Sequence, residues 1–310
     1  MLAPPFPFSI IRSVRMMIPK VDIARIHFPE GKAHDRPEVA DYNVCNLWEE
    51  NTRPQDYDVI LSATNTKNWV HAFHGDIVET LTIDDRESLR WMKQANEENY
   101  LGHFSHMWDD ELADTTAKYQ HAMPQLVPTE GWFIRTEHVS LKTGMYGAGP
   151  YHSLENILKS IVTSSGRHQA LRPDDSQCVI YFLQWRQIEP DREMRCFVYQ
   201  DRLTAISAQT WFRPAKWLAG LSDAELTSLT HNIRRFFQDT ICPRLLYLSG
   251  HYTFDLAILS DGFPYFIEPN PFGARYSAGS SLFHWIKDAH LLENWETIQL
   301  RFVVQVTETL

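Results

Sequence analysis

The sequence has 310 residues, of which 44% are hydrophobic and 22% are charged, a composition typical of a globular protein with one large domain or two modest ones. Its formal net charge of -10 argues against a nucleic-acid partner, because binding a phosphate backbone needs a basic stripe. An anionic ligand would therefore have to be held by a few placed cations or by a metal ion.

The cysteines and the N-terminal stretch indicate a cytoplasmic protein. Cys45, Cys178, Cys196 and Cys242 form no Cys-x-x-Cys pair, and three of them stand among apolar residues, which favours reduced, buried thiols over disulfides or a zinc site. The first 20 residues carry prolines and arginines where a signal peptide needs one unbroken apolar run. No later stretch is long enough to span a bilayer, so we expect no membrane partner.

Residues 1–125 alternate short apolar runs with polar connections, and we expect an N-terminal α/β region that recognises a substrate or partner. The runs 57–63 and 77–83 are interpreted as short strands. The stretch 84–99 predicts a helix capped by one of its two leading aspartates. No pair of histidines in this region has metal-ligand spacing on a convincing helix.

A second region, residues 126–310, begins with a predicted strand in 131–144. A loop with three glycines follows in 143–151. The stretch 153–162 then carries leucines and isoleucines at helical spacing behind a Ser153 cap. The resulting order is strand, glycine loop and helix.

The rest of this region predicts strands, hairpins and one capped helix. A fully apolar strand is predicted over 178–185, and two strands about a Tyr-Gln-Asp-Arg turn over 193–211. The stretch 222–240 predicts a helix, because Ser222 and Glu225 have the spacing of a capping box. The layout is that of a mixed α+β domain rich in antiparallel hairpins.

The stretch FDLAILSDGFPYFIEPNPF, residues 254–272, places acids in two apolar runs around an Asp-Gly turn signal. A two-residue turn at Asp261-Gly262 would make the flanking runs an antiparallel hairpin. Counting outward from that turn puts Asp255 directly opposite Glu268.

Asn270 falls on the same face of this ribbon as Asp255 and Glu268, because side chains alternate along a strand. Two carboxylates across an antiparallel pair repel each other unless a positive charge lies between them. Mg²⁺ could supply this positive charge, since it prefers carboxylate and amide oxygens as ligands and leaves room for substrate phosphates. The alternative is that each acid simply lies on a solvated face.

A phosphate-bearing ligand would need cations and backbone donors, and the strand and loop around residue 140 offer both. Arg135 and Lys142 supply charge, and Gly144, Gly147 and Gly149 would let the loop fold over phosphates with its N–H groups turned inward. The alternative is that these glycines and Lys142 belong to an ordinary surface loop that binds no phosphate.

Two further features have a structural and a functional interpretation. Arg195 is a charge flanked by apolar residues on a strand, which indicates an ion pair, with Glu193 or a remote carboxylate as partner, or an anion site. The run 179–185 is either an ordinary core strand or a strand whose backbone reads an adenine edge.

This order of parts resembles the ATP-grasp superfamily, in which ATP lies between two α+β subdomains. The segments EMRCFV, AIS, FDLAI, IEPNPF and SLFHW follow one another as in the cell division cycle protein 123 (D123) family, a divergent ATP-grasp branch. The resemblance covers about residues 130–290, with a faint continuation in VCNLWEE, residues 44–50. Members of that family act as assembly chaperones for eukaryotic translation initiation factor 2.

The resemblance implies a role for each matching residue, with ATP and Mg²⁺ as cofactors. Arg135 stands in place of the first lysine of the family's phosphate strand and Lys142 matches the second. The nucleotide would be bound by Arg135, Lys142, Gly144, Gly147, Tyr181, Phe182, Leu183, Gln184 and Arg195, and the metal by Asp255, Glu268 and Asn270.

Two functions from different classes follow from the resemblance. The first is a carboxylate–amine ligase of specialised metabolism that forms an amide through an acyl phosphate, with Arg195 and Lys142 as catalytic cations and Arg275 binding a small-molecule carboxylate. The second is an ATP-binding assembly chaperone for a translation initiation factor 2 subunit. We favour the ligase, because the residues that match are catalytic in type while the partner-related segments diverge.

Overall fold

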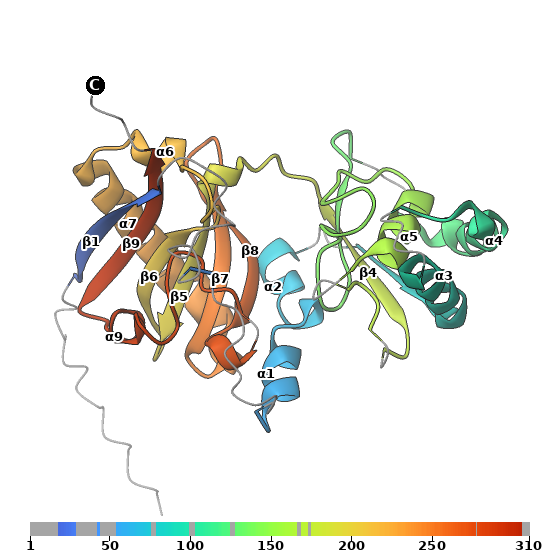
Figure 1. Cartoon of the computed structure of the whole chain (residues 1–310), viewed down its shortest axis with the longest axis horizontal. Helices are drawn as coiled ribbons and strands as arrows, with labels where there is room; N and C mark the ends of the chain where they lie inside the picture. Colours follow the sequence, from blue (N-terminus) through green and yellow to red (C-terminus); the bar gives the residue numbers. More distant parts are fainter. Residues whose placement is uncertain are drawn as a thin grey trace, which may run out of the picture.

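A computed structural model of the chain describes residues 18–28, 42–43, 54–75, 79–98, 103–124, 128–165, 169–172, 175–276 and 278–305. These residues form two β-sheets that lie apart in Figure 1, with α1 and α2 between them. We call the six-stranded sheet with α6 to α9 the large lobe, the three-stranded sheet with α3 to α5 the small lobe, and residues 54–75 the strap.

The sheet of the large lobe has the strand order β1-β9-β6-β5-β7-β8. Strands β1 and β6 lie on either side of β9 and both run parallel to it, and the remaining neighbours are antiparallel. The strands are β1 (Lys20–Phe28), β5 (Glu193–Tyr199), β6 (Arg202–Ala208), β7 (His251–Ile258), β8 (Pro264–Pro271) and β9 (Thr297–Gln305).

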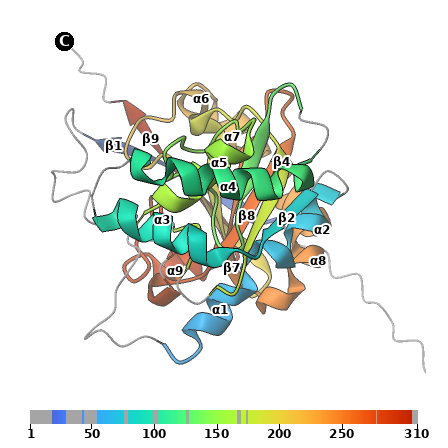
Figure 2. The same cartoon turned by 90° about the vertical axis from the view of Figure 1, so that its right-hand side faces the viewer.

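The sheet of the small lobe has the order β2-β4-β3, with β4 antiparallel to both neighbours. Its strands are β2 (Glu79–Ile83), β3 (Trp132–Arg135) and β4 (Cys178–Gln184). Figure 2 shows α3, α4 and α5 on the side of this lobe that faces the viewer. Most buried side chains of these helices and strands form one hydrophobic cluster, whereas Tyr181 and Leu183 of β4 belong to the cluster under the large sheet.

The α-helices in the described part of the chain vary from short turns to 14 residues. None of them has the length and apolarity that crossing a membrane requires. They are α1 (Tyr57–Ala63), α2 (Val70–His74), α3 (Arg86–Glu98), α4 (Asp109–Tyr119), α5 (Leu154–Thr163), α6 (Lys216–Ala219), α7 (Asp223–Phe236), α8 (Cys242–Arg244) and α9 (Ala289–Leu292).

The α+β, ATP-grasp fold class expected from the sequence is confirmed, but the N-terminal region was harder to predict. The run 57–63, interpreted as a strand, is helix α1. The run 77–83, also interpreted as a strand, contains β2. The helix predicted over 84–99 is α3, and Asp85 accepts a hydrogen bond from the Ser88 hydroxyl at its start. Strands β1 and β9 were not predicted. Cys45 and the segment 44–50 lie outside the described residues.

Local signals in the second region predicted its elements well. Ser153 caps α5 by accepting a hydrogen bond from the backbone N–H of Asn156. The β5–β6 hairpin turns at Gln200 and Asp201, which have φ angles of 50° and 56°. The capping box at Ser222 and Glu225 is complete, and α7 continues into the π-helical turn Phe237–Ile241.

Replacing Ser222 by alanine should destabilise the protein by about 1 kcal/mol, because the capping box loses the hydroxyl that accepts the N–H of Glu225. Ser228→Ala, on the exposed side of the same helix, is the matched control and should stay within about 0.5 kcal/mol of wild type. Urea denaturation of both variants measures the difference. If Ser222→Ala were as stable as Ser228→Ala, the capping box would not contribute to the stability of the protein.

Candidate functional site

The candidate site lies on the face of the large sheet opposite α7. Cys196 and Phe254 pack in the same cluster as the apolar residues of α7, so their strand neighbours Arg195 and Asp255 point to the other face. Asp255 pairs with Glu268 of β8 and Thr253 with Asn270, as the sequence predicted. Arg195 of β5 is the partner of Asp255 on its other side.

This register arises from two irregularities that cancel. The hairpin loop is one residue longer than the predicted two-residue turn, because Ile258 pairs with Pro264 and the N–H of Leu259 donates to the carbonyl of Phe263. Gly262 takes the left-handed conformation that this loop needs, with φ of 83°. A bulge between Asp255 and Leu256 then restores the register.

Arg195 and Asp255 form a buried bidentate ion pair. Nε and Nη2 of Arg195 donate to Oδ1 and Oδ2 of Asp255 at 2.9 and 2.8 Å, and Nη1 donates to the carbonyl of Gly279 at 2.7 Å. A Cβ at position 279 would lie 3.0 Å from that Nη1 atom, so the glycine permits the contact. The side-chain amides of Gln209 and Asn270 add long contacts to Asp255, at 3.4 and 3.5 Å.

A second ion pair joins the two lobes. Nη2 of Arg135, on β3 of the small lobe, lies 2.7 Å from Oε2 of Glu268, on β8 of the large lobe. The Arg135 side chain is 3% exposed, and its guanidinium lies 5.0 Å from the ring centre of Trp69. Its Nε donates to the hydroxyl of Thr66 at 3.4 Å. Arg135 and Glu268, both predicted site residues, are thus brought together with two strap residues.

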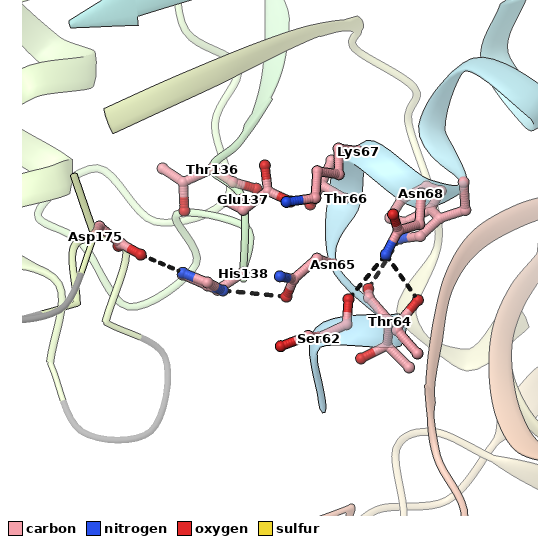
Figure 3. Close-up of polar contacts among 12 residues, drawn as sticks. Ser62, Thr64, Asn65, Thr66, Lys67, Asn68, Thr136, Glu137, His138 and Asp175 are labelled. Atoms are coloured by element: carbon pink, nitrogen blue, oxygen red, sulfur yellow. Dashed lines mark hydrogen bonds and ion pairs between the residues drawn. The ribbon is translucent and has the colours of Figure 1, made fainter. Parts of the chain in front are cut away.

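The strap also holds the turn that follows Arg135 (Figure 3). The Thr66 hydroxyl donates to the carbonyl of Thr136 at 2.7 Å, and the Thr66 N–H donates to that of Glu137 at 2.8 Å. The ring of His138 lies between Asn65, at 3.2 Å, and Asp175, at 2.8 Å. Because these contacts are short and at least partly buried, they fix the position of Arg135 through its neighbours.

The acids of the site differ in their ionisation. Burial raises the pKa of Glu268, but the charges of Arg135, Lys142 and Arg195 outweigh it and lower the pKa to about 2. Burial raises the pKa of Asp255, and the Arg195 guanidinium opposes that rise. Burial, together with the charges of Asp255 and Glu268, raises the pKa of Glu193 to about 7. Glu193 is therefore partly protonated at neutral pH.

The glycine loop rests on α5. The N–H groups of Met145 and Tyr146 donate to the hydroxyls of Thr163 and Ser160, and that of Gly147 donates to the carbonyl of Gly144. A Cβ on Gly144 would lie 2.3 Å from the Ser160 carbonyl oxygen, so this glycine allows the loop to pack on the helix. These three N–H groups are thus bound to protein acceptors and are not turned toward a ligand.

The remaining predicted site residues, Lys142, the residues 181–184 and Arg275, are not part of the two ion pairs. Lys142 is exposed, and its charge still lowers the pKa of Glu268. Tyr181 and Phe182 pair with strands on both sides, whereas Leu183 and Gln184 pair with β3. Arg275 is exposed on the 3-10 helix Ala274–Tyr276.

The donor set of the predicted metal site has the chemistry that Mg²⁺ prefers, two carboxylates and an amide on facing strands. Each carboxylate, however, already has an arginine partner. In the described part of the chain, no group of three or more histidine, cysteine or acidic residues is arranged to hold a metal ion. Asp255, Glu268 and Asn270 thus fit Mg²⁺ by type, and the arginines would have to exchange partners.

Comparison with known proteins identifies the family to which this chain belongs. The family model of D123 matches residues 151–309, which is more than half of the chain. The chain belongs to the D123 family. The suspected resemblance is therefore confirmed, and the matched residues include Arg195 and the acids of β7 and β8. No curated protein sequence matches the chain.

Solved structures support the same fold for this D123 protein. The structure of Cdc123 from Schizosaccharomyces pombe matches with a TM-score of 0.52 at 15% identity, covering 78% of this chain and 97% of that one. The C-terminally truncated form of the same protein matches with a TM-score of 0.50 at 16% identity, covering 78% and 96%. At this identity the likeness shows the fold alone.

The prediction of a carboxylate–amine ligase is wrong. Family membership in D123 and the Cdc123 structures overturn it, and small-molecule carboxylate and amine substrates lose their support. The physical reason is that cations and carboxylates placed to bind a nucleotide look the same in sequence whatever the bound nucleotide is used for. Their catalytic type was therefore no guide to the function.

Sequence reasoning missed the residues that position Arg135. Trp69 and Thr66 lie 66 and 69 positions before Arg135 in the chain, and neither belongs to a recognisable motif. Glu193 was considered only as a partner for Arg195, but it is a third acid beside the site. Its position on the same strand, two residues before Arg195, was the available signal.

Glu193→Gln should make the protein less sensitive to rising pH. The folded wild type keeps the Glu193 proton up to a pKa of about 7, whereas the unfolded chain loses it near the model value of 4.5. Between these values wild-type stability should fall relative to the variant as the pH rises, by roughly 3 kcal/mol at most. Urea unfolding at pH 5, 6, 7 and 8 measures this difference.

Glu130→Gln, at an exposed position away from the site, is the control and should follow the wild-type profile. A stability difference between wild type and Glu193→Gln that stays constant from pH 5 to pH 8 would contradict the raised pKa of Glu193.

Proposed function

We propose that this D123 protein is an Mg-ATP-binding assembly chaperone for a subunit of eukaryotic translation initiation factor 2. The observation that carries the proposal is the family match over residues 151–309, which includes the paired charges of β5, β7 and β8. The division of labour we propose gives residues 126–310 the nucleotide and residues 1–125 a share in partner recognition.

The charges at the boundary between the lobes support a nucleotide site there. Arg135 comes from the small lobe, and Arg195 and the two acids come from the large lobe. Lys142 adds an exposed cation close enough to influence Glu193, Asp255 and Glu268. Three cations of this kind suit a triphosphate, which this acidic chain could hold only by locally placed charge.

In this proposal the residues fall into three roles. Arg135, Lys142 and Arg195 would neutralise phosphate charge, and Mg²⁺ would supply a bridge between the phosphates and the carboxylates. Leu183 and Gln184, at the end of β4, would lie along the adenine, with Tyr181 and Phe182 behind them. Asp255, Glu268 and Asn270 would hold the metal ion.

Coupling to a partner would follow from the ion pair between the lobes. Arg135 and Glu268 are the groups that the nucleotide and metal would engage, and they also hold the small lobe against the large one. Binding Mg-ATP would therefore change how tightly the lobes are joined. A partner segment that binds both lobes would respond to that change.

Lys142→Ala should weaken Mg-ATP binding roughly tenfold, because it removes one charge-assisted contact to phosphate. Glu268→Gln keeps the side-chain shape but removes a metal ligand, and it should abolish the dependence of ATP binding on Mg²⁺. Lys216→Ala, an exposed charge change on α6, should bind like wild type. Isothermal titration calorimetry measures all three.

The chaperone role is tested with the same variants and the purified subunits of translation initiation factor 2. Wild type should capture one subunit, and Mg-ATP should change the amount captured, whereas Glu268→Gln should not respond to the nucleotide. Unchanged Mg-ATP affinity in both site variants would refute the site. Normal Mg-ATP binding without capture of any subunit would refute the chaperone role alone.

A further inference from the structure

A hollow of about 350 Å³ lies between the first turns of α3 and α4. These helices are at the end of the small lobe that is farthest from the large sheet (Figures 1 and 2). The lining residues are Asp85, Glu87, Ser88, Trp91, Trp108 and Glu111. None of them belongs to the candidate nucleotide site, so the hollow is a separate feature.

An indole and a carboxylate at helical spacing come from α3, and a second such pair comes from α4 and the 3-10 turn His106–Trp108 that precedes it. Glu87 and Trp91 are four residues apart on α3, and Trp108 and Glu111 are three apart at the start of α4. Trp91 is 59% exposed, whereas Trp108 is partly buried and packs against the core of the small lobe. Trp91 therefore offers an accessible aromatic face on which a ligand could stack.

The hollow also has an uncompensated negative charge. Its lining has three acids and no basic side chain. Asp85 is partly neutralised, because Lys118 lies 3.4 Å from its Oδ2 atom. Glu87 and Glu111 are exposed and have no ion pair among the described residues. The cations near these residues are Lys118, the exposed Arg90 and Arg86, whose Nη2 donates to the carbonyl of Arg172. Asp84, Asp109 and Asp110 at the starts of the two helices add negative charge.

We propose that this hollow binds an arginine side chain of a partner protein. A guanidinium is planar and weakly hydrated, so it stacks on an indole face and donates paired N–H groups to a carboxylate at the same time. A lysine ammonium gains less, because it is compact and strongly hydrated. The volume is at the lower end of the range for ligand sites and is sufficient for one such side chain.

The test uses a short uncharged peptide with one arginine, and matched peptides in which citrulline or lysine replaces it. Citrulline has the shape of arginine without its charge. The readout is the indole N–H signals of Trp91 and Trp108 in ¹H–¹⁵N spectra of the full chain, assigned with Trp91→Phe and Trp108→Phe. We expect both signals to shift and saturate with the arginine peptide, more weakly with lysine, and not with citrulline.

Glu87→Gln and Glu111→Gln should each weaken arginine binding roughly two- to fivefold, and raising the ionic strength should weaken it further. Both positions are exposed, so the variants should fold normally, and Glu130→Gln should bind like wild type. Equal binding of citrulline and arginine, or no saturable shift of either indole, would overturn the proposal. Neither outcome bears on the nucleotide site.

Discussion

The ion pair between Arg135 and Glu268 is the contact on which the arrangement of the two lobes depends. Two buried charges are costly unless each has a close partner and further hydrogen bonds. Arg135 meets this condition with Glu268 on one side, and with Thr66 and Trp69 of the strap on the other. The strap therefore connects the lobes physically and also completes the environment of Arg135, the cation of the ion pair that joins them.

The position of the acids was predictable from the sequence because strand alternation is a strong constraint. Placing Asp255 opposite Glu268 needed only a hairpin and a register count, and the pairing is as predicted. The count succeeded although the loop is longer than assumed, since the bulge beside Asp255 compensates for it. Helix caps such as Ser153 and Ser222 were equally predictable, because capping depends on a few neighbouring residues.

The strap could not be predicted, because its conformation depends on contacts far away in sequence. The apolar run in Tyr57–Ala63 suits a short strand as well as a helix, and tertiary packing decides for the helix. Phe73 stacks on Phe266 of β8 with ring centres 3.8 Å apart, a contact that spans 193 positions in the chain. The sequence could not decide between ligase and chaperone, since the residues common to both are those expected to bind a nucleotide in either case.

The paired charges also bear on how the proposed cofactors would bind. A triphosphate entering alone would meet Asp255 and Glu268 as well as the arginines, and Mg²⁺ entering alone would leave two buried guanidinium groups without their carboxylates. If both entered together, every charge would keep a partner, because the carboxylates would hold the metal and the guanidinium groups would meet the phosphates. Under the proposed function, the arginine–carboxylate pairs would therefore favour binding of the metal and the nucleotide as one unit and would disfavour either one by itself.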